Sequence, residues 1–118
     1  MIVWSGKESE LMKNGIYGLY ADNKLLYIGS TRETFKHRLQ GHNSVLKKEN
    51  HTNALYSYLK YNDDKKSLTM KPFVIFDYVR TNKTIDAEAC GWMELGLISS
   101  FRPRFNQKGL KETFIFPH

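Results

Sequence analysis

The chain has 118 residues, 41% of them apolar, and its 18 Lys and Arg residues against 12 Asp and Glu residues give a net charge of +6. This length predicts one domain over residues 1–118, and the charge favours a polyanionic partner, although solubility alone would also account for it. The single cysteine, Cys90, excludes a disulfide framework, and without a signal-like or membrane-length apolar run we expect a cytoplasmic protein with no membrane partner.

The first predicted element is a β-hairpin. Residues 16–20 are rich in aromatic and β-branched side chains, Asp22-Asn23 is a turn pair, and residues 25–28 resume the apolar run. The hairpin carries two related tripeptides, Gly15-Ile16-Tyr17 and Tyr27-Ile28-Gly29. Tyr17 and Tyr27 are therefore candidates to flank one cleft, and the alternative is that both phenols only pack within the hairpin.

A helix is predicted to follow the hairpin. Ser30-Thr31-Arg32-Glu33 fits a capping box, and the pattern continues to about Leu46. Its apolar stripe has Arg38 and His42 along one edge, four residues apart. Such an edge can line a cleft that binds phosphate; Arg38 can instead form an exposed salt bridge or cover the stripe with its stem.

Two further elements are predicted in the middle of the chain. Residues 53–61 have apolar side chains at helical spacing, and residues 73–79 form a compact aromatic and β-branched run typical of a strand. Pro72 indicates that the strand starts at a sheet edge. The tyrosines of the middle helix are interpreted as packing residues: Tyr56, Tyr58 and Tyr61.

A last helix is predicted from Thr84 or Asp86 to about Phe101, where Arg102-Pro103 ends it. One face of this helix is apolar and has Glu94 at its centre, whereas Glu88 falls on the opposite side. A carboxylate on a core-facing stripe is costly unless it is paired, protonated or bound to a metal. Glu94 is therefore a candidate metal ligand or the partner of Arg38 or a lysine. The apolar face consists of Cys90, Met93, Leu97, Ile98 and Phe101.

The ordered set of both tripeptides, Arg38, Glu94 and Asn106 resembles the signature of the GIY-YIG endonuclease family. The run around Glu94 is similar to the glutamate helix of that family, and Pro103-Arg104-Phe105-Asn106 is similar to its asparagine loop. The resemblance covers about residues 14–108. It implies an α+β fold with a small, mostly antiparallel, three-stranded sheet flanked by helices, and a free-standing endonuclease.

The same resemblance implies hydrolysis of DNA phosphodiester bonds, in duplex or branched DNA, with one divalent cation, Mg²⁺ or Mn²⁺, on Glu94. Arg38 would neutralise the scissile phosphate. Tyr17 would accept a proton from water, with its pKa lowered by nearby Arg38 and His42. Tyr27 is the alternative base or a water-orienting residue, and His42 would carry the proton away.

Several other positions follow from the resemblance. DNA-binding or structural roles are implied for Gly29, Ser30, Arg32, His51 and Asn106. Ser30 and His51 are similar to phage homing endonucleases, whereas residues 114–116 are similar to a segment of the excision-repair nuclease subunit, so the subfamily stays open.

A zinc site is disfavoured at His37 and His42, because their spacing places them on different helix faces and no cysteine pair precedes them. Two other function classes remain alternatives: a catalytically silent nucleic-acid-binding module and a protein-interaction domain. The sequence leaves the oligomeric state open.

Overall fold

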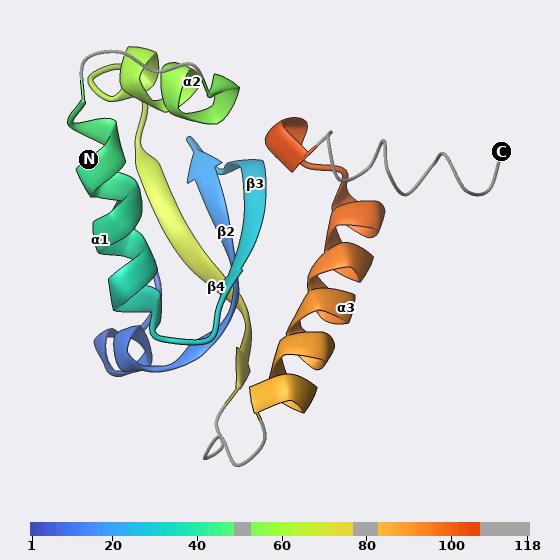
Figure 1. Cartoon of the computed structure of the whole chain (residues 1–118). Helices are drawn as coiled ribbons and strands as arrows, with labels where there is room; N and C mark the ends of the chain where they lie inside the picture. The colour runs from blue at the N-terminus through green and yellow to red at the C-terminus, as the bar shows by residue number, and fades with distance from the viewer. Residues whose placement is uncertain (49–52, 77–82, 107–118) are drawn as a thin grey trace, which may run out of the picture.

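A computed structural model describes residues 1–48, 53–76 and 83–106. The chain forms an α+β fold in which a four-stranded sheet separates two layers of helices (Figure 1). None of the described helices combines the length and the hydropathy that a membrane span requires.

The sheet has the strand order β1-β4-β2-β3. β2 (Asn14–Ala21) is antiparallel to both β3 (Lys24–Thr31) and β4 (Leu68–Phe76), whereas β1 (Val3–Trp4) is parallel to β4. The α+β class and the antiparallel hairpin are confirmed. The prediction of three strands is wrong, because the short β1 adds a fourth and makes the sheet mixed.

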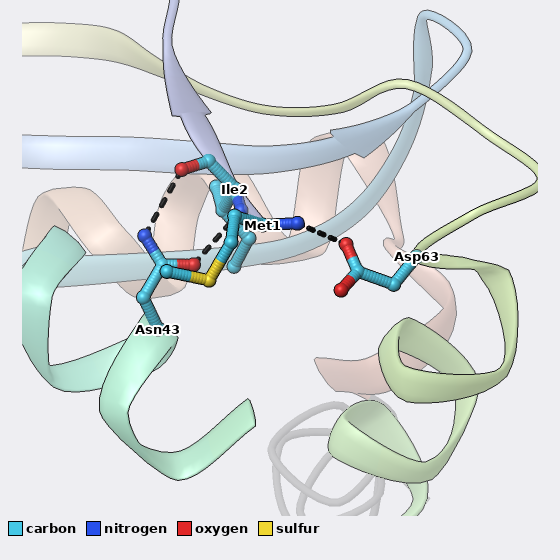
Figure 2. A network of polar contacts seen from close by, with 4 residues as sticks. All are labelled: Met1, Ile2, Asn43 and Asp63. Atoms are coloured by element: carbon cyan, nitrogen blue, oxygen red, sulfur yellow. Dashed lines mark hydrogen bonds and ion pairs between the residues drawn. The ribbon is translucent and has the colours of Figure 1, made fainter. Parts of the chain in front are cut away.

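Polar contacts from two helices hold the chain start in place (Figure 2). Asn43 accepts a hydrogen bond from the Ile2 amide at 2.8 Å and donates one to the Ile2 carbonyl at 3.0 Å, while the Met1 amine pairs with Asp63. Ile2 itself is buried in the core. These contacts precede the two residues that pair with β4, Val3 and Trp4, which favour strands but form a run too short to predict one.

The hairpin is built as the sequence predicts. Asp22 and Asn23 both have positive φ, 47° and 69°, which is the backbone of a tight two-residue hairpin turn. Leu19 pairs with Tyr27 and Tyr20 with Leu25, so Leu26 is the extra residue of a β-bulge. Position 15 requires glycine for two reasons. A Cβ there would lie 1.9 Å from the Val74 carbonyl oxygen, and the φ of +150° is one that residues with a side chain rarely adopt.

α1 (Phe35–Leu46) begins later than predicted. Its N-cap is Thr34, which accepts a hydrogen bond from the His37 amide at 3.0 Å. The predicted capping box at Ser30 is wrong, because Ser30 and Thr31 are the last residues of β3 and pair with β2. Cross-strand pairing has therefore decided between two chemically acceptable caps.

α1 and α2 (Ala54–Asn62) cover one face of the sheet, and α3 (Lys83–Phe101) covers the other (Figure 1). The larger part of the core lies under α1 and α2 and includes Tyr17, Leu26 and Phe35. The smaller part lies under α3. Two short 3₁₀ helices, Glu8–Met12 (η1) and Arg104–Asn106 (η2), complete the described elements.

β4 differs from the predicted strand in its bounds and in its place in the strand order. It begins earlier, at Leu68, and lies between β1 and β2 in the strand order. β1 pairs only with Thr69 and Met70, so at Pro72 that side of β4 has no pairing strand among the described residues; residues 77–79 lie outside them. Pro72 fits there because the register shifts beside it: Tyr17 pairs with Pro72 and Ile16 with Val74, which leaves Phe73 as the extra residue. Proline is tolerated within sheets at such bulges.

α3 contacts the sheet with only part of the predicted apolar stripe. Ile98 is buried and Glu94 and Leu97 are half-buried, but Met93 and Phe101 are 42% and 56% exposed. The placement of Met93 and Phe101 in the core is therefore wrong, whereas Leu97 and Ile98 pack in the smaller part of the core. The side chains of Glu88 and Cys90 lie outside the described part of the structure.

Candidate active site

Tyr17 and Tyr27 share the face of the sheet that α1 and α2 cover. Their rings both contact His42 of α1, at centroid distances of 5.7 and 6.2 Å. Tyr17 is fully buried, whereas Tyr27 is half-buried. Gly29, which pairs with Tyr17 across the hairpin, makes room for the phenol, because a Cβ there would lie 2.5 Å from Tyr17 Oη.

A chain of hydrogen bonds runs through this face and ends at Arg38. Tyr17 Oη lies 2.7 Å from His42 Nε2, and His42 Nδ1 lies 2.8 Å from the hydroxyl of Tyr56 on α2. Arg38 donates from Nε to Tyr17 Oη at 3.3 Å. The expectation that Arg38 and His42 lie on either side of Tyr17 is confirmed, since both contact its hydroxyl.

Burial sets the protonation states of this chain. It raises the pKa of Tyr17 well above its usual value, and Tyr27 raises it further, while Arg38 acts in the opposite direction. The expected lowering of the Tyr17 pKa is therefore wrong. Burial, with a contribution from the Arg38 charge, also lowers the pKa of His42 to about 4, so this imidazole is neutral at physiological pH.

Glu94 approaches the site from the other face of the sheet. Ser30, near the end of the edge strand β3, donates a hydrogen bond of 2.5 Å to Glu94 Oε2. Burial and the Glu94 charge raise the pKa of Tyr27, and the Arg38 charge opposes them. Tyr27 thus lies within the electrostatic reach of both the carboxylate and the guanidinium, and the site spans the edge of the sheet.

The surroundings of Glu94 suit one hard cation better than a protein-built metal cage. Among the described side chains, those of residues 1–48, 53–76 and 91–106, no group of three His, Cys, Asp or Glu could surround a metal. In the same residues, Glu94 forms no ion pair with Arg38 or a lysine. A half-buried carboxylate with a single serine partner fits an ion such as Mg²⁺, which keeps water and substrate phosphate as most of its ligands.

Asn106 links η2 to the edge strand β3 by two hydrogen bonds. Its Oδ1 accepts from the Ile28 amide at 2.7 Å, and its Nδ2 donates to the Ile28 carbonyl at 2.9 Å. The side chain thereby uses backbone groups of β3 that would otherwise be open at a sheet edge. This geometry gives Asn106 a structural role directly beside Tyr27.

Arg32, His37 and His51 are the candidates for which the structure gives no contact with the site residues. Arg32 is exposed in the connection between β3 and α1, and His51 lies outside the described residues. His37 is exposed and pairs with Glu33 at 3.1 Å. The two ring nitrogens of His42 contact the hydroxyls of Tyr17 and Tyr56.

Tyr56 is the residue that sequence reasoning missed. It was interpreted as a packing residue because Tyr56, Tyr58 and Tyr61 are all compatible with the amphipathic pattern of α2. Only the packing of α2 beside α1 brings its hydroxyl to His42. No spacing in the sequence distinguishes Tyr56 from its two neighbours on the same helix.

Comparison with protein families returns one match, to a model described as the GIY-YIG catalytic domain, over residues 13–106. The chain has no significant match among curated proteins or solved structures. The matched segment contains the hairpin, all three helices and Asn106, which together build the site described above.

Proposed function

The chain belongs to the GIY-YIG family, whose catalytic domain is that of a nuclease, and we propose that it is a metal-dependent endonuclease that hydrolyses DNA. One observation carries this proposal: a carboxylate, a guanidinium, two phenols and an imidazole form a continuous set around Tyr27 and Tyr17. A fold kept only for binding would gain nothing from placing Glu94 there, because its charge repels phosphate unless a cation neutralises it.

Glu94 and Arg38 have complementary tasks in this proposal. Glu94 would hold Mg²⁺ or Mn²⁺ through its carboxylate, and the bound ion would supply charge stabilisation for the leaving oxygen. Arg38 is half-buried and would bind the scissile phosphate with the guanidinium nitrogens that do not face Tyr17. Ser30 keeps the carboxylate oriented.

Tyr17 accepts the proton of the attacking water in the proposed reaction. In the resting protein Tyr17 is buried, and its bond to Arg38, at 3.3 Å, is longer than its bond to His42, at 2.7 Å. Tyr17 Oη has a second lone pair beside the one that accepts from Arg38 Nε, and this lone pair would receive the proton of the water. Because burial raises the Tyr17 pKa, no free phenolate is available, and Tyr17 passes its own proton to His42 Nε2 in the same step.

Tyr27 orients the water in this scheme. Its phenol is half-buried and lies in the fields of both Glu94 and Arg38. The proton balance closes: water gives one proton to Tyr17, Tyr17 gives one to His42, and the leaving oxygen takes one from solvent. The new bond joins the water oxygen to phosphorus as the bond to the leaving oxygen breaks.

DNA is the proposed substrate because the small domain carries a net charge of +6. Binding that depends on phosphate contacts weakens steeply with salt. The sequence and the site do not select duplex over branched DNA, and the cytoplasm is the proposed location because the chain uses only one cysteine.

Cleavage of supercoiled plasmid, single-stranded DNA and branched DNA, each with Mg²⁺, with Mn²⁺ and with a chelator, tests the proposal. We expect nicked or linear product only when a divalent cation is present. Salt-sensitive binding without cleavage of any substrate would instead support a silent nucleic-acid-binding module. The absence of both binding and cleavage would support a protein-interaction domain.

A further inference from the structure

Three side chains from three elements form a linear hydrogen-bonded array under the sheet. Tyr17 comes from β2, His42 from α1 and Tyr56 from α2, and the two hydroxyls lie on opposite ring nitrogens of the imidazole. Exposure increases along the array: Tyr17 is 0% exposed, His42 4%, and Tyr56 is half-buried. The array therefore leads from the buried end of the site towards solvent.

The donors and acceptors of this array have to be assigned consistently. A neutral imidazole carries one N–H and one lone pair, so it can accept from one tyrosine and must donate to the other. His42 is neutral because burial and Arg38 lower its pKa to about 4. Either Nδ1–H donates to Tyr56 and Nε2 accepts from Tyr17, or both directions are reversed.

The contact between Arg38 and Tyr17 separates these two arrangements. Arg38 has only donors, so Tyr17 Oη accepts from its Nε. In the reversed arrangement Tyr17 would also accept from His42, and its own O–H would have no acceptor in the described part of the chain. Because Tyr17 is fully buried in the resting protein, bulk solvent does not supply that acceptor. The first arrangement satisfies every donor of Tyr17 and His42.

We propose that Tyr56 is a positioning residue that holds His42 in the Nδ1–H tautomer and so aims the lone pair of Nε2 at the hydroxyl of Tyr17. Tyr56 supplies the acceptor without which Nδ1–H would be buried unpaired. The catalytic consequence, that Nε2 can take the proton of Tyr17, rests on the proposed function. The tautomer itself does not, so it can be tested separately.

The first test is nitrogen NMR of the full chain with ¹⁵N-labelled histidine near pH 7, with the His42 signals assigned by their loss in His42→Gln. We expect Nδ1 of His42 to be protonated and Nε2 to be unprotonated. Tyr56→Phe, which keeps the ring and deletes the hydroxyl, should weaken this preference, because Nδ1–H then loses its acceptor while the contact between Arg38 and Tyr17 still favours the same tautomer. The matched control is Tyr58→Phe on the same helix, whose hydroxyl contacts Lys66, and it should leave the tautomer unchanged. An Nε2–H tautomer in the unaltered protein, or an unchanged tautomer preference in Tyr56→Phe, overturns the proposal.

The second test is single-turnover DNA cleavage by the same variants at saturating protein. Tyr56→Phe should lower the rate by about tenfold or more, at the lower end of what proton transfer contributes, and should leave DNA affinity unchanged. Tyr58→Phe should cleave at the normal rate. A shifted tautomer with a normal rate overturns the catalytic consequence of the proposal. If the unaltered protein cleaves no DNA, the proposed function fails, and the NMR experiment still decides the tautomer.

Discussion

The hydroxyl of Ser30 donates a hydrogen bond of 2.5 Å to Oε2 of Glu94, and this contact joins the edge strand β3 to α3. It brings a residue that directly follows one tripeptide to the carboxylate of the glutamate helix. The two faces of the sheet contribute to one site through this link, because Tyr27 lies on the α1 side of β3 and Ser30 on the α3 side. Within the described part of the chain this contact uses only Oε2 of Glu94, so Oε1 would be open to the proposed cation.

Glu94→Gln should abolish cleavage and keep or tighten DNA binding. The change removes the proposed metal ligand and one negative charge but almost no volume. We expect the single-turnover rate to fall by about 100- to 1,000-fold or more, the range typical of lost charge stabilisation. The control is Glu33→Gln, an exposed acid near the start of α1. Near-normal nicking by Glu94→Gln would remove Glu94 from the mechanism.

Arg38→Ala should lower the cleavage rate by about 100-fold and DNA affinity only a few-fold, because charge matters most as the phosphorane forms. Arg38→Lys should not restore the rate, since lysine has no Nε–H to donate to Tyr17 while a second group binds phosphate. Lys36→Ala, on the exposed side of α1, serves as the control. If Arg38→Ala weakened binding and left the saturated rate intact, Arg38 would be a docking residue only.

Gly29→Ala should destabilise the fold by about 1–3 kcal/mol, as overpacking of a core does. The added methyl would lie 2.5 Å from Tyr17 Oη and 2.8 Å from Tyr27 Cε2, so both phenols would have to move. Gly41→Ala on α1 is the matched control, because nothing lies within 4 Å of its Cβ position and alanine favours a helix by up to about 1 kcal/mol. Urea denaturation measures the free energy of unfolding of both variants. If Gly29→Ala were as stable as Gly41→Ala, the packing role of Gly29 would be contradicted.

Local signals in the sequence predict the parts of the fold that local interactions determine. The hairpin is such a part, since Asp22 and Asn23 suit its turn. The start of α1 is not, because Ser30 and Thr34 are both good caps and pairing with β2 decides between them. β1 has only a short local signal, two residues of high strand propensity, and it forms against Thr69 and Met70 far along the chain.

The candidate site also has features that local sequence predicts and features that depend on tertiary packing. Helical spacing places Arg38 and His42 on one edge of α1, and both contact Tyr17 as expected. The pKa of Tyr17 was beyond sequence reasoning, because neighbouring charges can be inferred from spacing but complete burial cannot. The contact of Tyr56 with His42 likewise depends on how two helices pack.

Stability should fall as the pH falls from 6.5 to 4. The His42 pKa is about 4 in the fold and about 6.5 in the unfolded chain, so the unfolded chain binds more protons in this window. The loss from His42 is on the order of 3 kcal/mol and is complete below pH 4. The groups that face His42 are Arg38, Tyr17, Tyr27 and Tyr56.

The fall in stability between pH 6.5 and 4 should disappear when the buried His42 is replaced. His42→Gln should flatten the slope between pH 6.5 and 4 in chemical denaturation, because no group remains there that is forced to stay neutral. His37→Gln, which changes an exposed histidine, should keep the slope. A slope that is the same in both variants would show that other groups cause it.

Tyr17→Phe should lower the cleavage rate far more than Tyr27→Phe, because the hydroxyl of Tyr17 has a partner that can take its proton, His42 Nε2 at 2.7 Å. Each change keeps the ring and deletes one hydroxyl. Since the Tyr17 pKa is raised, we expect no gain in rate from tyrosinate near neutral pH, and a rate lost at low pH as His42 protonates near pH 4. Single-turnover rates from pH 4 to 9, with Tyr20→Phe as the control, measure both effects. An inactive Tyr27→Phe beside a fully active Tyr17→Phe would exchange the two roles, because Tyr27 is the more exposed phenol and lies nearer the Glu94 charge.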